Sequence, residues 1–183
     1  LIYMHEKHRM LHLDLKPGNI MRRASDGHIF LIDFGLSKHY SSDGKPETST
    51  TVGLGTAGYA PIEQGNQEHS AEFRPTIDVY AFGATLYKLL TGNTPPTASD
   101  VMNDSNRLTD GLHRASISQH TIDIVVKAMQ PLVKERYQSI RQFIEALATQ
   151  PQNDEDTIQS DEDTIVEAVL DEPTTTTPKE KNE

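Results

Sequence analysis

The sequence contains no cysteine in its 183 residues. Disulfide bonds and thiolate metal sites are therefore excluded, and a reducing cytoplasm is the expected location. No apolar run of about eighteen residues occurs, so the chain is not expected to span a membrane. The sequence also lacks a basic stripe interleaved with aromatic side chains, and nucleic acid is therefore not an expected partner.

Apolar residues make up only 35% of the chain, which is low for a sequence that folds throughout. Residues 150–183 contain 11 Asp or Glu and 2 Lys, a net charge of −9, whereas residues 1–149 contain 16 acidic and 15 basic residues, a net charge of −1. Low hydrophobicity with high net charge is typical of disorder. We therefore expect a folded domain over residues 1–149 and a disordered acidic tail, rich in Thr and Pro, over 150–183.

The acidic tail repeats a short motif, because Asp154–Ile158 has the same five letters as Asp161–Ile165. Phosphorylation of Thr157 or Thr164 in this acidic setting would create a ligand for a phosphothreonine-binding module. The alternative interpretation is a solvating tail whose repeat has no function.

The most chemically informative segment is His12–Asn19, which reads HLDLKPGN. Two short strand-like runs joined at an Asp-Gly turn follow it and lead to Asp33, the first residue of Asp-Phe-Gly. A hairpin returns the chain to its start, so Asp33 is expected beside Asp14 and Asn19. Two carboxylates, an amide and the Lys16 ammonium suit phosphoryl transfer, in which the protein holds Mg²⁺, positions a hydroxyl and neutralises phosphate charge. The alternative is an ordinary hairpin with surface charges at its base.

This ordered pair of motifs resembles the catalytic and metal-binding loops of the eukaryotic-type (Hanks-type) serine/threonine protein kinases, in particular bacterial members. The resemblance implies that Asp14 is the catalytic base and that Lys16 contacts the transferred phosphate. It implies that Asn19 and Asp33 bind metal, Mg²⁺ or alternatively Mn²⁺, and that Lys16, Asn19 and Asp33 together bind ATP. Proteins with Ser or Thr hydroxyls are the implied substrates.

Position 13 departs from the family, which usually has arginine where this chain has Leu13. In the family that arginine meets a phosphate on the activation loop, for which Leu36–Gly53 is the counterpart here. Hydroxyls of this polar segment, including Thr48, Thr50 and Thr51, are candidate autophosphorylation sites. A plain solvated loop is the alternative interpretation.

The segment Gly55–Gln64 resembles the substrate-docking loop of the family. Within it, Thr56 matches the threonine that hydrogen-bonds the catalytic aspartate and lysine, although a simple turn residue is the alternative. Five other residues match supporting positions of the family: His12, Gly35, Glu63, Asp78 and Arg136. The resemblance implies that His12 is hydrogen-bonded beneath the metal-binding aspartate and that Asp78 fixes the catalytic-loop backbone. It also implies a buried ion pair between Glu63 and Arg136. An ordinary surface arginine is the alternative for Arg136.

Apolar periodicity predicts helices over Thr76–Thr91, Thr97–Asp104, Gln119–Gln130 and Ser139–Thr149. Thr76 is the expected N-cap of the first, and Gly92 its expected end. The segment Asn106–Ser118 is expected to be a loop, and the apolar residues Ile140, Phe143, Ile144 and Leu147 are expected in the core. The predicted fold class is α+β and mainly α-helical, similar to the C-terminal lobe of a protein kinase with its catalytic-loop hairpin.

The expected function is transfer of the γ-phosphate of ATP to Ser or Thr of protein substrates. The chain begins at Leu1 rather than Met, within what resembles a helix, so this N-terminus is expected to be a cut end. The ATP-clamping N-terminal lobe of the family has no counterpart in this sequence, so the chain alone is expected to be inactive. Two alternatives remain open. One is a catalytically silent, pseudokinase-like scaffold that presents a phosphorylatable tail, and the other is a small-molecule phosphotransferase with a kinase-like fold.

Overall fold

The computed structural model describes residues 1–41, 55–65 and 74–149. The chain divides into two units, Leu1–Gln150 and Pro151–Glu183, and the described residues all belong to the first. Among the described residues, no helix combines the length and the apolar content that crossing a membrane requires.

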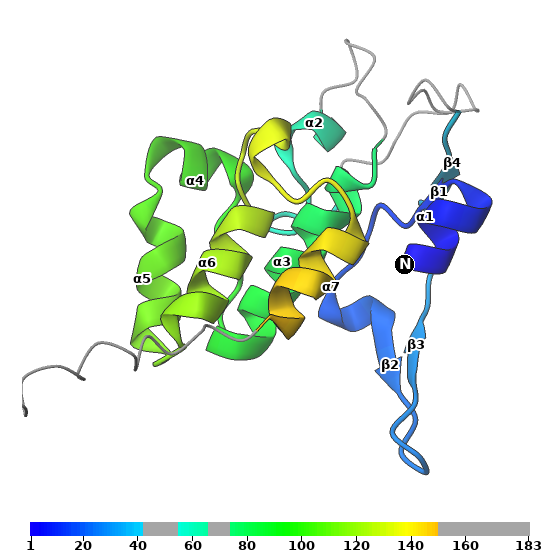
Figure 1. Ribbon diagram of the computed structural model, residues 1–183, viewed down its shortest axis with the longest axis horizontal. Coiled ribbons are helices and arrows are strands. Elements are labelled where there is room, and N and C mark those ends of the chain that lie inside the picture. Colours follow the sequence, from blue (N-terminus) through cyan, green and yellow to red (C-terminus); the bar gives the residue numbers. More distant parts are fainter. Residues whose placement is uncertain (42–54, 66–73, 150–183) are drawn as a thin grey trace, which may run out of the picture. The chain divides into compact units, whose positions relative to one another are not determined.

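The longest helix, α3 (Thr76–Thr91), runs through the middle of the helical part of the protein (Figure 1). It ends at Gly92, whose φ of 72° is a left-handed conformation that favours glycine and lets its N–H bond to the carbonyl of Lys88. Both ends agree with the sequence-based prediction. The predicted cap is wrong, because Pro75 holds the N-cap position and the buried Thr76 hydroxyl has no hydrogen-bond partner among the described residues.

Four further helices surround α3: α4 (Ala98–Asn103), α5 (Asn106–Arg114), α6 (Gln119–Ala128) and α7 (Ile140–Ala148). Two apolar clusters join them to α3. The first includes Tyr80, Ala84, Tyr87, Leu108, Leu112, Ile122, Val125 and Met129, and the second includes Val79, Ile124, Ala128, Tyr137, Ile140 and Phe143. A side chain as large as Phe143, fully buried, contributes about 1.5–3 kcal/mol.

The expected loop over Asn106–Ser118 is wrong, since α5 occupies most of it. Only two apolar side chains of α5, Leu108 and Leu112, face inward, one turn apart. The rest of the helix is polar and includes Gly111, so its tertiary contacts, more than its own sequence pattern, stabilise it.

The N-terminal part of the chain forms helix α1 (Ile2–His8) and two small antiparallel sheets. In one sheet, β1 (Met10–Leu11) pairs with β4 (Lys38–His39). In the other, β2 (Ile20–Arg22) pairs with β3 (Ile29–Leu31), with Met21 opposite Phe30. This hairpin projects away from the helices (Figure 1).

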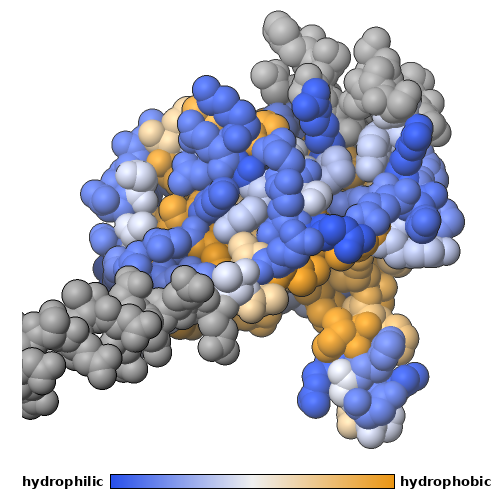
Figure 2. Space-filling model, in the orientation of Figure 1, coloured by the Kyte–Doolittle hydropathy of each residue, from blue (hydrophilic) through white to orange (hydrophobic). Residues whose placement is uncertain are grey.

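An apolar surface lies where the β2–β3 hairpin leaves the helices (Figure 2). It borders a cavity of about 390 Å³ lined by Leu1, Ile2, Tyr3, Leu15, Ile20, Ile29, Leu31, Phe82, Ile140 and Ile144. On α7, Ile144 is 43% exposed and Leu147 is 38% exposed, so their predicted place in the core is wrong. The apolar stripe of α7 is wider than the face that α3 and α6 cover.

Candidate functional site

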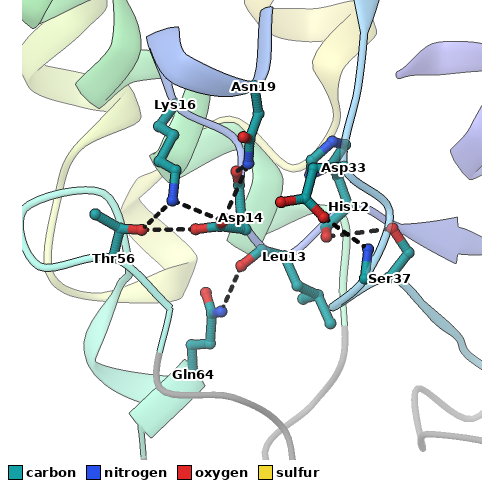
Figure 3. Close-up of polar contacts among 10 residues, drawn as sticks. His12, Leu13, Asp14, Lys16, Asn19, Asp33, Ser37, Thr56 and Gln64 are labelled. Atoms are coloured by element: carbon teal, nitrogen blue, oxygen red, sulfur yellow. Dashed lines mark hydrogen bonds and ion pairs between the residues drawn. The ribbon is translucent and has the colours of Figure 1, made fainter.

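Asp14, Lys16 and Thr56 form a closed triangle of hydrogen bonds (Figure 3). Lys16 Nζ donates to Asp14 Oδ2 and to Thr56 Oγ1, each at 2.8 Å, and Thr56 Oγ1 donates to Asp14 Oδ1 at 2.7 Å. The hydrogen bonds predicted for Thr56 are therefore present. Each carboxylate oxygen of Asp14 has a donor, so the orientation of this side chain is fixed.

Local backbone structure brings these three side chains together. Lys16 is extended, with φ −160° and ψ 164°, and residues two apart in extended chain point to the same side, which places its ammonium beside Asp14. Thr56 begins a tight turn in which its carbonyl accepts from the N–H groups of Tyr59 and Ala60. Gly58 in this turn has a φ of 84°, and a Cβ there would lie 2.6 Å from the carbonyl oxygen of Pro95, so only glycine lets the turn approach so closely.

Asn19 lies at the end of a 3₁₀ helix, Pro17–Asn19, and is buried. Its Nδ2 donates to the backbone carbonyl of Asp14 at 2.7 Å and to Asp14 Oδ2 at 3.0 Å. Both donor hydrogens are thus directed at Asp14. The amide oxygen of Asn19 is left without a hydrogen-bond partner in the described part of the chain and can serve as a metal ligand.

The environment of Asp14 favours its charged form. Burial raises the pKa of this carboxyl, but hydrogen bonds from Lys16 and Thr56, the Lys16 charge and a hydrogen bond from Asn19 outweigh burial and hold the pKa below its ordinary value. The group is therefore an ionised acceptor at neutral pH. A fixed carboxylate beside an ammonium can orient a hydroxyl and neutralise an incoming anion.

Asp33 follows the β2–β3 hairpin, which returns the chain to Asn19. The N–H of Ile32 donates to the carbonyl of Asn19 at 2.9 Å, so Asp33 comes one residue after this contact. Its exposed carboxylate accepts the N–H of Gly35 at 3.2 Å and points to the side on which Asp14 and Asn19 lie (Figure 3). Within the described residues, Asp33 makes no hydrogen bond to the Asp14 cluster, and no group of three His, Asp or Glu suited to a metal occurs.

His12 differs from its expected arrangement. It is fully buried with its ring centroid 5.2 Å from that of Phe34, yet neither ring nitrogen has a hydrogen-bond partner among the described residues. The expected hydrogen bond beneath Asp33 is therefore absent. The backbone of His12 is bonded instead: its carbonyl accepts from Ser37 Oγ at 3.3 Å, and its N–H donates to Asp78.

Asp78 holds the backbone of the Asp14 loop, as the sequence predicts. This fully buried carboxylate on α3 accepts the N–H of His12 at 2.8 Å and the N–H of Leu13 at 2.9 Å. The same carboxylate is bonded to His5 Nε2 at 2.8 Å. Since Leu13 directly precedes Asp14, these bonds fix the backbone from which the Asp14 side chain extends.

The predicted ion pair between Glu63 and Arg136 is also confirmed. Arg136 donates to both carboxylate oxygens of Glu63, at 2.6 and 3.1 Å, and its side chain is 0% exposed. Glu63 belongs to the short helix α2 (Ile62–Gly65), so the pair fixes α2 to the segment before α7.

Two buried residues of this region were not singled out by sequence reasoning. His5 bonds to Asp78, and Gln64 donates through Nε2 to the carbonyl of Leu13 at 2.6 Å. The only signal for Gln64 is its position directly after Glu63, and His5 lies in an apolar run without a motif of its own. The candidate phosphorylation sites Thr48, Thr50, Thr51, Thr157 and Thr164 lie outside the described residues.

Curated relatives share the sequence of this region. The chain is 34% identical over 155 residues to serine/threonine-protein kinase B of Synechocystis sp., an alignment that covers 80% of this chain and 25% of the relative. It is 40% identical over 111 residues to serine/threonine-protein kinase PknL of Mycobacterium tuberculosis, covering 58% of this chain and 26% of the relative. The chain thus spans about a quarter of the length of these relatives.

A solved structure described as the apo form of PpkA-294 is similar, with a TM-score of 0.59 and 27% identity, over 80% of this chain and 49% of that one. The model of the protein kinase domain family matches residues 1–160. Together with the mainly helical α+β fold, this match establishes that the chain belongs to the protein kinase domain family.

Proposed function

We propose that this chain is the C-terminal, catalytic lobe of a protein serine/threonine kinase, with the lobe over residues 1–149 and an acidic tail over 150–183. The observation that carries the proposal is the hydrogen-bonded triangle of Asp14, Lys16 and Thr56. The names of the bacterial relatives support a Ser or Thr hydroxyl of a protein as the acceptor.

In the proposed reaction, Asp14 accepts a hydrogen bond from the substrate hydroxyl and takes its proton as the oxygen attacks the γ-phosphorus of ATP. The bond from this phosphorus to the bridging oxygen breaks in the same step, and ADP leaves. Lys16 neutralises negative charge on the phosphoryl group. Thr56 fixes both side chains, because it donates to Asp14 and accepts from Lys16. Holding the reacting groups in this geometry is the main contribution that a protein makes to phosphoryl transfer.

The chemistry of the donor set fits a hard divalent cation. Asn19 directs both amide hydrogens at Asp14 and keeps its oxygen free of hydrogen bonds in the described part, and Asp33 presents an exposed carboxylate. Oxygen ligands of this kind suit Mg²⁺, and Mn²⁺ is an alternative. We propose that Asn19 and Asp33 hold the cation that accompanies ATP. This cation would neutralise part of the negative charge on the phosphates of ATP.

We also propose that the chain transfers phosphate only together with an ATP-binding lobe, since kinases clamp ATP between two lobes. The experiment is therefore a fusion in which the chain follows the ATP-binding lobe of a bacterial serine/threonine kinase. We expect the fusion to phosphorylate Ser or Thr in a peptide library with Mg-ATP. Turnover of small hydroxyl compounds without peptide labelling would favour the small-molecule phosphotransferase instead, and a folded, ATP-binding fusion without any turnover would favour the scaffold.

Asp14→Asn in this fusion removes the proposed base and keeps the size of the side chain. We expect kcat to fall by about 10²–10⁴-fold, the typical contribution of general base catalysis, while ATP affinity changes little. Asp110→Asn is the matched control, because Asp110 is exposed on α5 and takes no part in the site. Unchanged kcat in the Asp14 variant would show that Asp14 is not the base.

A further inference from the structure

The peptide before Asp14 has an unfavourable backbone conformation that its neighbours hold in place. Leu13 has a φ of 66°, which is rare for a residue with a branched side chain and costs of order 1 kcal/mol. Its N–H donates to Asp78, its carbonyl accepts from Gln64, and its side chain is buried against Leu11 and Ile77. Such a conformation persists only where surrounding contacts enforce it.

Gln64 is the contact that joins this peptide to a different part of the chain. Its side chain is 3% exposed, and its Nε2 lies 2.6 Å from the carbonyl oxygen of Leu13 (Figure 3). A Cβ placed on Gly55 would lie 2.8 Å from the same nitrogen, so the Gln64 amide is packed directly against the backbone that precedes Thr56. One amide therefore touches the residue before Asp14 and the residue before its partner Thr56.

The support for Gln64 is itself rigid. The adjacent Glu63 is fixed by its two hydrogen bonds to the buried Arg136. Gly55 has a φ of 67°, and a Cβ there would also lie 2.7 Å from the Cβ of Ala60, so no side chain fits between this part of the turn and Gln64. The Gln64 amide thus lies between two backbone segments, bonded to the carbonyl of Leu13 and packed against Gly55.

We propose that Gln64 is a positioning residue for Asp14, whose amide sets the distance between the catalytic-loop backbone at Leu13 and the turn at Gly55–Thr56. Without its hydrogen bond, the left-handed Leu13 peptide loses a restraint and the Thr56 hydroxyl no longer meets Asp14 at 2.7 Å. The family usually has arginine at position 13, but here Leu13 is apolar and buried, so no charged side chain at this position takes part in the alignment. The effect on catalysis rests on the proposed kinase function, but the alignment itself does not.

The first test measures alignment in the 183-residue chain by NMR and needs no activity. Gln64→Met keeps the side-chain length but removes the donor. We expect the Leu13 carbonyl and the Thr56 methyl resonances to shift, and hydrogen exchange of the His12 and Leu13 amides to accelerate about 5- to 100-fold, the range for loss of one buried hydrogen bond. Unshifted Thr56 resonances in the folded variant would overturn the proposal.

Gln119→Met is the matched control for this test. Gln119 also donates through Nε2, to Asp123 at 2.7 Å, but it is exposed on α6, so its replacement should leave Leu13 and Thr56 unchanged. Gly55→Ala provides a second variant, because its Cβ would displace the Gln64 amide from the other side. Since Gly55 directly precedes Thr56, only the resonances at Leu13 are informative in this variant. We expect it to shift the Leu13 carbonyl resonance, and a Leu13 signal unaffected by it would count against the proposal.

The second test separates kcat from KM in the fusion with an ATP-binding lobe. Gln64→Met should lower kcat by about 10- to 100-fold, as expected when a catalytic group is slightly misplaced, with little change in the KM for ATP. A rise in KM alone, or an equal loss in Gln119→Met, would overturn the positioning role. If the unmodified fusion shows no transfer, the kinase proposal fails, and the NMR result alone then decides the role of Gln64.

Discussion

Arg136 uses all five of its guanidinium hydrogens inside the protein. Besides the two bonds to Glu63, it donates to backbone carbonyls of Gln130, Pro131 and Thr76, and it lies 5.0 Å from the ring centroid of Tyr80. A planar group with five donors fits such a set of acceptors, whereas lysine would leave several of them unpaired. Glu63 therefore compensates the charge of Arg136, and the backbone carbonyls accept its remaining hydrogens.

We expect Arg136→Leu to lower the free energy of unfolding by about 3–5 kcal/mol, since it leaves the Glu63 carboxylate and several buried carbonyls without a donor. Urea denaturation at pH 7 measures this change. The control is Arg107→Leu, which breaks the exposed pair of Arg107 and Asp100 and should leave the denaturation midpoint nearly unchanged. Equal changes in the two variants would show that burial of the Glu63–Arg136 pair contributes nothing to stability.

At the scale of elements, the contact between α5 and α3 depends on a glycine. A Cβ on Gly111 would lie 1.9 Å from the hydroxyl oxygen of Tyr87 and 2.8 Å from its Cζ. Tyr87 is itself 4% exposed in the first apolar cluster, so its ring has no free space to enter. The absence of a side chain at Gly111 therefore lets the two helices approach each other.

We expect Gly111→Ala to destabilise the protein by about 1–3 kcal/mol through overpacking, although alanine in an isolated helix would gain up to about 1 kcal/mol over glycine. Thermal unfolding followed by circular dichroism measures the change. Adding Tyr87→Phe removes the atom nearest to the new methyl group and should restore part of the loss. A Gly111→Ala variant as stable as the original protein would mean that α5 and α3 separate easily.

The same glycine shows why the sequence predicts some elements and not others. The ends of α3 are predictable, because its apolar residues are nearly continuous and Gly92 follows them. The helix α5 is not, because its polar composition and Gly111 indicate a loop until the contact with Tyr87 is known. Likewise, motifs identify Asp14, Lys16 and Thr56, whereas Gln64 and His5 gain their roles only from tertiary contacts with Leu13 and Asp78.

At the scale of the whole described unit, Asp78 links three parts of the chain. From α3 it bonds to the side chain of His5 in α1 and to the backbone of His12 and Leu13. Burial raises the pKa of Asp78, but the hydrogen bond and charge of His5 and the two backbone N–H groups outweigh burial and leave the pKa below its ordinary value. Folding is therefore coupled to the ionised form of this carboxyl.

The sign of the resulting pH dependence follows from linkage. A carboxyl whose pKa is lower in the folded state stabilises the protein above its unfolded-state pKa of about 3.9, and this contribution is lost as the pH falls through the folded-state value. We expect the free energy of unfolding, measured with urea at steps from about pH 6 to pH 2, to decline through this range. Asp78→Asn should be less stable at pH 7 and show a shallower decline, whereas Asp110→Asn should keep the original slope. If Asp78→Asn does not fold, ¹³C NMR of the Asp78 carboxyl in the unaltered chain decides the point, and a pKa at or above about 3.9 would contradict the prediction.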